Sequence, residues 1–208
     1  MTSVDKERDL FSEVTDLDKY DVVGIGPGLG QDPKTVNGLS RLLKDFGKPT
    51  VLDADALNII SANPQLRAAI PENSILTPHP KEFERLAGKW KDDFERLQLQ
   101  REMAIALKVI ILVKGGYTTI ASPDGKLYFN PTGNPGMATG GTGDVLTGIL
   151  TGLLAQGYSA TDAAILGVYL HGLAGDLASV DKGEDSLIAS ELVEFLPQAF
   201  QKMARNRP

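Results

Sequence analysis

The sequence predicts an α/β fold with a largely parallel sheet and a β-hairpin at one edge. Short apolar runs alternate with segments whose apolar residues recur at helical spacing, an order typical of α/β layers. Residues 109–113 are wholly apolar, as in strands buried on both faces of a parallel sheet. Residues 117–121 and 126–130 are joined by Ser-Pro-Asp-Gly, a turn sequence that predicts the hairpin.

The other elements follow from spacing and from turn residues. Apolar residues form a helical stripe over residues 34–46, and Pro80 occupies the favoured first position of another helix. We expect strands at residues 21–25, 49–53 and 74–77 before the apolar strand and the hairpin. We expect helices at residues 34–46, 54–62, from Pro80 onward, 92–107, 141–156, 160–178 and 187–203.

Composition limits the classes of function. The 208 residues, 42% of them hydrophobic, suit a single domain that spans residues 1–208. The absence of cysteine excludes disulfides, iron–sulfur clusters and Cys-based zinc sites. A net charge of −6 gives no basic footprint for nucleic acid. The charged N-terminus does not resemble a signal peptide, and no charge-free apolar run reaches the ~20 residues of a membrane span. We therefore expect a cytoplasmic protein with no nucleic-acid or membrane partner.

Charge is scarce between residues 109 and 178, so this region is expected to supply the core and a pocket. Six glycines fall within residues 133–148, just before an apolar helix. Glycine lets backbone N–H groups approach a ligand, and a helix start adds free donors and a positive dipole end. The run Gly140, Gly141, Thr142 and Gly143 is therefore expected to cradle a phosphate. The pattern is neither a Walker A sequence nor a dinucleotide-binding turn.

Asp144 follows this cradle directly, where a carboxylate would be repelled by a bound phosphate. It could accept a proton from a substrate hydroxyl that attacks a phosphoryl group. It could equally be an N-cap or first-turn residue that stabilises the helix. Local sequence leaves both interpretations open.

Three more polar loops follow expected strands, where ligands of open α/β sheets bind. The first is the glycine loop at residues 24–30, which could hold a ligand or form a tight turn. The second carries Asp53, Asp55 and Asn58, which could bind Mg²⁺ or hydroxyls, or cap a helix. In the third, His79 stands between two prolines and could be a ligand or a structural residue.

Two further residues were weighed in the same way. Lys114 follows the most apolar strand and could contact phosphates or lie in a surface turn. His171 is surrounded by small and apolar residues on a helix, so we expect a packed histidine or one that supports the site from behind.

The combined motifs resemble one family. Gly-Pro-Gly-Leu-Gly at residues 26–30, Asp-Ala-Asp-Ala-Leu-Asn at 53–58, Thr-Pro-His-Pro-Lys-Glu at 77–82, Lys-Gly-Gly-Tyr-Thr at 114–118 and the 134–144 glycine motif occur in that family's order. The chain resembles the ADP/ATP-dependent NAD(P)H-hydrate dehydratases of the ribokinase-like superfamily, from about residue 21 to the C-terminal helices. The resemblance implies a three-layer α/β/α fold. It also implies repair of the S form of hydrated NADH or NADPH, by phosphorylation of the ring hydroxyl and elimination of phosphate.

The resemblance also implies roles by position. Asp144 corresponds to a hydrate-binding aspartate and is the candidate general base, and residues 140–143 would hold the transferring phosphoryl group. The implied nucleotide-binding residues are Lys114, Gly115, Gly116, Tyr117, Thr118, Asn134, Gly140, Gly141, Thr142 and Gly143. The implied substrate-binding residues are Gly28, Gly30, His79, Asp53, Asn58 and Asp144. Mg²⁺ is expected with the ADP or ATP co-substrate, without a dedicated set of protein ligands. A homo-oligomer is also implied.

One departure from the family concerns the N-terminus. Family members carry further sequence before the Gly-Pro-Gly loop, whereas this chain has an acidic leader at residues 1–20. We therefore expect a complete nucleotide half and a substrate half that lacks elements. Two alternatives stay open: a kinase of the same superfamily that acts on vitamin precursors, and a nucleotide-binding module without catalysis.

Overall fold

The computed structural model describes residues 4–205 and contains a six-stranded sheet with the strand order β1-β2-β3-β4-β5-β6. The first four strands are parallel, and β5 and β6 pair antiparallel at one edge as the predicted hairpin. The strands are β1 (Val23–Ile25), β2 (Thr50–Leu52), β3 (Ile75–Leu76), β4 (Ile110–Val113), β5 (Thr119–Ala121) and β6 (Leu127–Phe129). The predicted fold class is confirmed.

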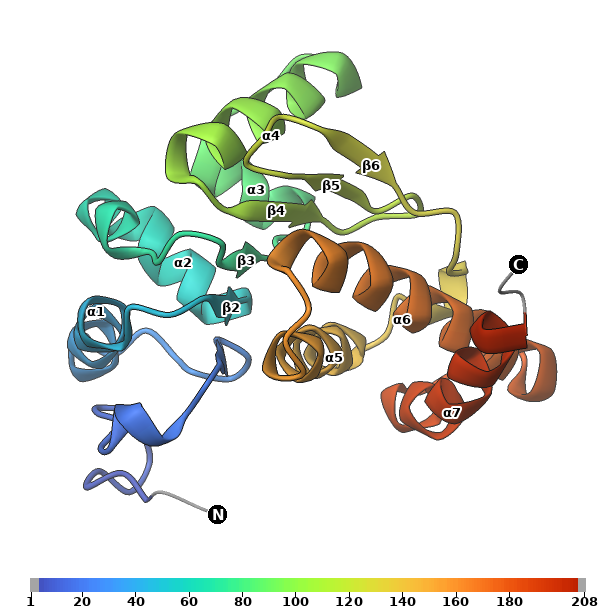
Figure 1. Cartoon of the computed structure of the whole chain (residues 1–208), viewed down its shortest axis with the longest axis horizontal. Helices are drawn as coiled ribbons and strands as arrows, with labels where there is room; N and C mark the ends of the chain where they lie inside the picture. Colours follow the sequence, from blue (N-terminus) through green and yellow to red (C-terminus); the bar gives the residue numbers. More distant parts are fainter. Residues whose placement is uncertain (1–3, 206–208) are drawn as a thin grey trace.

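Helices cover both faces of this sheet, which gives three layers (Figure 1). One face carries α1 (Pro33–Phe46), α2 (Ala54–Ala62), α3 (Pro80–Ala87) and α4 (Asp93–Leu107). The other carries α5 (Thr142–Ala155) and α6 (Ala160–Lys182), and α7 (Ala189–Arg205) packs on α6. The 3₁₀ turns η1 (Leu17–Lys19), η2 (Pro64–Ala69) and η3 (Pro135–Met137) were not expected, and α6 runs four residues beyond its predicted end at 178.

The hydrophobic core has two parts, one on each face of the sheet. Successive strand residues point to opposite faces, so each buried strand supplies both cores. Leu52, Leu76, Ile111 and Val113 pack with α1–α4, whereas Val51, Ile75, Ile110 and Leu112 pack with α5 and α6. Burial on both faces explains why β4 reads as an uninterrupted apolar run.

Parallel pairing also positions the polar loops. The segments after β1, β2, β3 and β4 leave the sheet at the same edge, because these strands run in one direction. The carboxyl ends of the strands therefore bring together the glycine loop, Asp53, His79 and Lys114, beside the start of α5.

The N-terminal segment contacts the first helix rather than extending away from it. Phe11, Val14, Leu17 and Tyr20 pack against the core beneath α1–α4. The backbone of Ser12 passes so close to Gly38 of α1 that an added Cβ would lie 2.6 Å from the Ser12 carbonyl oxygen. The segment expected as an acidic leader thus contributes to the packed domain.

Among the described residues, α6 alone is long and apolar enough to span a membrane by length and composition. More than half of its most apolar window, 56%, is buried within the fold. Such burial is the pattern of a core helix in a soluble protein.

Candidate active site

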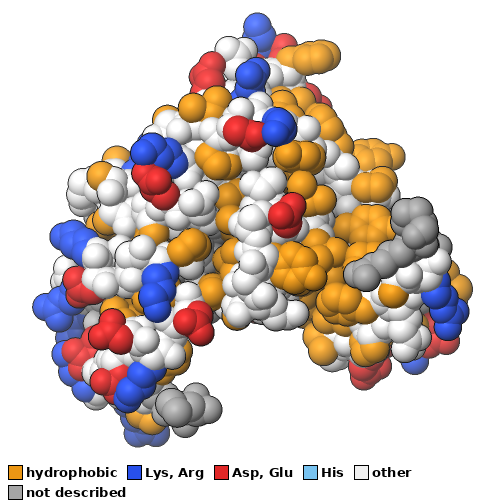
Figure 2. Space-filling model, in the orientation of Figure 1, with side chains coloured by type: hydrophobic (Ala, Val, Ile, Leu, Met, Phe, Trp, Pro, Cys, Tyr) orange, Lys and Arg blue, Asp and Glu red, His pale blue; other side chains and the backbone are white. Residues whose placement is uncertain are grey.

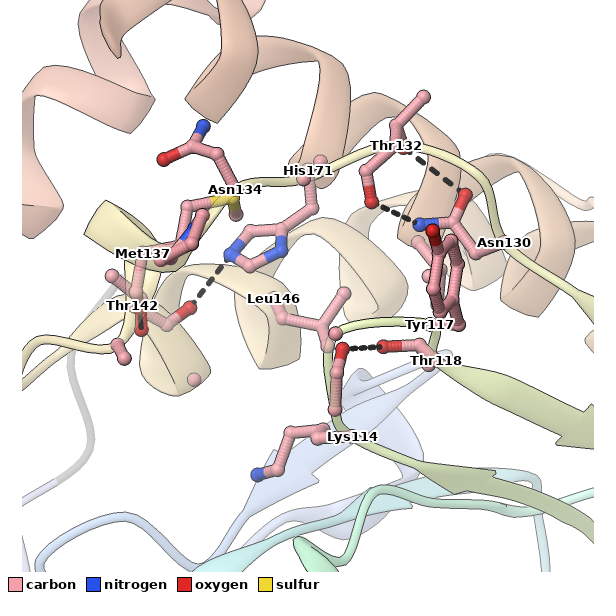
Figure 3. Close-up of a pocket in the computed structure, with 18 of the residues that line it drawn as sticks. Lys114, Tyr117, Thr118, Asn130, Thr132, Asn134, Met137, Thr142, Leu146 and His171 are labelled. Carbon is pink, nitrogen blue, oxygen red and sulfur yellow. Dashed lines mark hydrogen bonds between the residues drawn. The ribbon is translucent and has the colours of Figure 1, made fainter. Parts of the chain in front are cut away.

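A cavity of about 890 Å³ opens where the β4–β5 turn faces the segment before α5 (Figure 3). Lys114, Tyr117 and Thr118 lie on one side, and Thr142 and His171 lie on the other. The remaining walls come from residues 130–139 and from apolar side chains of α5 and α6. The volume is in the range of pockets that hold drug-sized ligands.

Most of the predicted nucleotide residues meet at this cavity. The lining includes Lys114, Gly115, Gly116, Tyr117, Thr118, Asn134, Thr142 and Gly143, together with His79. Gly140, Gly141 and Asp144 lie next to it in the sequence but do not line it. The lining also excludes Gly28, Gly30, Asp53 and Asn58. Most of the residues predicted to bind the substrate therefore lie apart from those predicted to bind the nucleotide.

Lys114 is held by a buried carboxylate. Its Nζ lies 2.7 Å from Asp53 Oδ1, and the Asp53 side chain is 2% exposed. Asp53 Oδ2 accepts a hydrogen bond of 3.0 Å from Thr147 on α5. Asp53 is also the N-cap of α2, so the structural interpretation of this residue is correct. Its carboxylate orients a cation at the cavity rather than facing the cavity itself.

The start of α5 lies beside this cation. Gly141 is the N-cap with φ of 90°, and the helix has no side-chain cap, so its first-turn N–H groups are available to a ligand. A Cβ built on Gly143 would lie 3.5 Å from Lys114 Nζ, which places the ammonium group against the first turn. The helix dipole and the ammonium group together favour a phosphate at this point.

Asp144 lies in the first turn of α5, one of the two structural positions that the sequence predicted for it. Its side chain is exposed, and Gly141 rather than Asp144 is the N-cap. The interpretation of Asp144 as an N-cap is therefore wrong, and the first-turn position holds. An exposed carboxylate one residue from the cradle is free to meet a substrate.

The glycine loop after β1 forms a separate part of the same edge. Gly28 and Gly30 both have positive φ, so the turn itself favours glycine there. The N–H of Gly30 donates to Asp55 Oδ2 at 2.9 Å. Asn58 lies beside Asp55 and accepts from Arg85 of α3 at 2.8 Å. These contacts fix the loop against α2, and they show that Asp55 and Arg85 support the loop that the sequence singled out.

His79 has a structural task and also faces the cavity. It is the N-cap of α3, where Nδ1 accepts from the N–H groups of Lys81 and Glu82 in a capping box. The ring is 45% exposed and lines the cavity. Both sequence interpretations of His79 are therefore compatible with the geometry.

Two residues of α6 were not recognised as part of the site. His171 was expected to be packed or to support the site from behind; it is half-buried, lines the cavity and lies 2.9 Å from the Thr142 carbonyl oxygen through Nε2. Burial lowers its pKa to about 4, so the neutral ring donates to that carbonyl. Asp176 accepts from Gly133 and Asn134. A half-buried Asp in a charge-poor segment needs partners, and that requirement could have identified it.

A resident metal centre does not fit the part of the chain that the structure describes, because no group of three His, Asp or Glu is placed to hold one. Both Asp53 oxygens already have partners. Magnesium that arrives on nucleotide phosphates needs only one or two carboxylates from the protein.

Comparison with known proteins identifies the family. The family model for NAD(P)H-hydrate dehydratases matches residues 2–198. A bifunctional NAD(P)H-hydrate repair enzyme of Moorella thermoacetica is 45% identical over 90% of this chain, which spans only 36% of that enzyme. The ADP-dependent (S)-NAD(P)H-hydrate dehydratase of Bacillus subtilis is 36% identical over 94% of this chain and 70% of the enzyme.

Solved structures support the same relationship. The ADP/ATP-dependent NAD(P)H-hydrate dehydratase of B. subtilis, co-crystallised with ATP and Mg²⁺, superposes with a TM-score of 0.76 at 35% identity, over 88% of this chain and 65% of that one. A ribokinase-like superfamily protein of Enterococcus faecalis superposes equally well at 33% identity, over 89% and 64%. The fold is therefore ribokinase-like. Because the family model covers nearly the whole chain and the B. subtilis enzyme is matched over 70% of its length, this chain belongs to the NAD(P)H-hydrate dehydratase family.

Proposed function

We propose that this chain uses ADP or ATP to dehydrate the S form of NADH or NADPH hydrate and so restores the reduced cofactor. The observation that carries the proposal is the meeting of the β4–β5 turn with the uncapped start of α5 at one cavity. A nucleotide in that cavity would place its phosphates against Lys114 and Gly143, next to the exposed Asp144.

The proposed chemistry needs a base and a phosphate cradle. The Asp144 carboxylate accepts the proton of the ring hydroxyl, whose oxygen attacks the terminal phosphorus of the nucleotide. The bond from that phosphorus to the nucleotide oxygen breaks, and the first-turn N–H groups of α5 with Lys114 stabilise the transferring charge. The C–O bond of the phosphorylated ring then breaks, phosphate leaves with the electron pair, and a proton leaves the adjacent ring carbon. Hydroxide, a poor leaving group, is thereby replaced by phosphate.

The hydrate would bind along the sheet edge outside the nucleotide cavity. The glycine loop with Gly28 and Gly30, backed by Asp55 and Asn58, borders that edge. His79 lies between this region and the cavity, because it lines the cavity from the loop after β3. Bound magnesium would neutralise part of the phosphate charge.

A homo-oligomer and a cytoplasmic location also belong to the proposal. Large hydrophobic side chains are exposed around α7: Ile188 at 54%, Val193 at 52% and Phe200 at 42%. Figure 2 shows hydrophobic side chains gathered on the side where α6 and α7 lie, whereas charged side chains cover the opposite side. Sedimentation equilibrium of the purified chain tests the oligomeric state.

The function is tested by adding ADP or ATP to purified S hydrate and following the near-ultraviolet absorbance of the reduced nicotinamide ring. Nucleotide-dependent recovery of NADH or NADPH is expected, with no recovery when nucleotide is omitted. A phosphorylated hydrate released without elimination would instead identify a kinase. Nucleotide binding without any turnover, in a folded chain, would identify a binding module and contradict the proposal.

A further inference from the structure

The wall of the nucleotide cavity contains a turn that is fixed from one side by α6. Four of the residues 133–137 line the cavity, all but Gly136, and the segment includes the short turn η3. The closest approach to α6 is made by Met137, which packs directly on Gly175, where an added Cβ would overlap the Met137 sulfur. Asp176 follows Gly175 on the same helix, and its carboxylate faces the turn.

Asp176 holds the turn through a chain of hydrogen bonds with a fixed polarity. Its Oδ2 accepts from the N–H of Gly133 at 3.0 Å, and its Oδ1 accepts from Asn134 Nδ2 at 3.1 Å. Because an ionised carboxylate only accepts, Asn134 must present its NH₂ group to Asp176. The Asn134 amide oxygen is thereby left to accept from the N–H of Gly136, also at 3.1 Å.

The same turn is connected to the phosphate cradle. The carbonyl of Met137 accepts a hydrogen bond of 2.9 Å from Thr142 Oγ1 at the start of α5. The turn therefore lies between Asp176 on one side and the first residue of α5 on the other. A change in the conformation of the turn would alter both the cavity wall and the support of the cradle.

We propose that Asp176 is a positioning residue for nucleotide binding, which acts through Asn134 to hold residues 133–137 in the conformation that forms the cavity wall. The ligand class, an adenine nucleotide, rests on the proposed function. Asp176 itself does not line the cavity, so it would affect a bound nucleotide only through the conformation of the turn.

A charge-conserving swap tests this assignment. In Asp176→Asn, the side chain keeps one acceptor oxygen for two donors, so its NH₂ group faces either Asn134 or the N–H of Gly133. At least one of the three hydrogen bonds is lost in either orientation. In Asn134→Asp, two carboxylates face each other. The double variant Asn134→Asp with Asp176→Asn reverses the polarity: Asn at 176 donates to Asp at 134, which still accepts from Gly136. All three hydrogen bonds are restored with no change in net charge.

Two measurements are made on the wild type, both single variants and the double variant. The first is hydrogen–deuterium exchange of peptides that cover residues 130–141 in the free protein. The second is the Kd for ADP and for ATP by calorimetry. The control is Asp181→Asn, which removes an exposed carboxylate from the same helix, where it pairs with neighbouring Lys182.

We expect faster exchange at residues 130–141 and a Kd raised about tenfold or more in each single variant, because charge-assisted hydrogen bonds are lost. The double variant is expected to return the exchange rates to within about threefold of the wild type, and the control is expected to change neither measurement. Affinity is not expected to return in full, because the swap moves the carboxylate from Asp176 to residue 134 in the cavity wall. Unchanged exchange in Asp176→Asn would overturn the assignment. A double variant without recovery of exchange would do the same. If the wild type binds no adenine nucleotide, the proposed function fails, while the exchange pattern still decides whether Asp176 holds the turn.

Discussion

Replacing Lys114 with methionine would test the electrostatic core of the site. The substitution keeps an apolar stem of similar length and removes the ammonium group that lies 2.7 Å from Asp53. The two partners differ in their access to water: the side chain of Lys114 is 23% exposed, whereas that of Asp53 is 2% exposed. Removing the ammonium group therefore leaves the Asp53 carboxylate buried without its charged partner and without access to water.

The size of the effect follows from this asymmetry. Breaking a buried ion pair by removing one partner costs about 3–5 kcal/mol, which corresponds to roughly 6–20 °C in Tm for a chain of this length. Hydrogen bonds to Asp53 from Thr147 and from the N–H of Ala54 remain, which favours the lower end of that range. The reverse change, Asp53→Asn, leaves a lysine that can reach solvent, so its expected cost is smaller, about 1–2 kcal/mol.

Urea unfolding measures the stability difference, and calorimetric titration with ADP and ATP measures the functional one. Lys114→Met is expected to lose both stability and nucleotide affinity, because the cation also faces the phosphate cradle. Lys126→Met is the matched control, since Lys126 pairs at 2.6 Å with Asp124 on the exposed hairpin turn, and little change is expected there. The reasoning would be refuted if Lys114→Met were no more destabilising than Asp53→Asn or than the control.

Three further predictions concern single residues. Asp144→Asn should lower turnover by about 10²–10⁴-fold with nucleotide Kd nearly unchanged, because a general base is lost from an exposed position; a Kd that rises in parallel would argue against that role. Gly140→Ala should fold with slightly higher stability yet bind nucleotide more weakly, since its Cβ meets no protein atom, whereas Gly141→Ala should lose about 1–3 kcal/mol because its φ is 90°. Burial lowers the pKa of His171 in the folded protein to about 4, below its unfolded value. The free energy of unfolding should therefore be highest above about pH 6.5 and should fall as the pH drops toward 4. The decrease due to this residue amounts to about 3 kcal/mol. The urea-unfolding free energy of His171→Gln should therefore depend less on pH across that window than the wild-type value, and an equal dependence would contradict the assignment.

The fold was largely predictable because its signals are local. The wholly apolar strand β4, the hairpin turn and the amphipathic pattern of α1 each depend on neighbouring residues. The 3₁₀ helix η2 was missed because its six residues are too few to show a periodic apolar pattern. The end of α6 was placed too early because its last turn is solvent-exposed and lacks the apolar spacing of the preceding turns, as exposed Val180 and Asp181 show.

The loops of the site were also predictable, because parallel strands bring their carboxyl ends to one edge. The partners of the side chains were not, since they are joined over long separations in sequence. Lys114 pairs with a carboxylate 61 positions away, and Asp176 binds a backbone group 43 positions away. Sequence spacing carries no information on such contacts. A charged residue in an apolar segment needs a hydrogen-bonding or charged partner. That requirement predicts that Lys114 and Asp176 each have a partner, but it does not identify the partner.

Two sets of glycines near the site differ in why glycine is present, and the distinction bears on function. Gly26, Gly133 and Gly141 have positive φ, so the backbone itself requires glycine at these positions. Gly115, Gly116 and Gly140 have ordinary φ, and a Cβ at any of them would meet no protein atom. Folding does not explain glycine at the second group, where alanine would reduce the entropy of the unfolded chain and stabilise the protein. Two of these three line the cavity and the third adjoins the phosphate cradle, so a ligand that approaches the backbone supplies the missing reason.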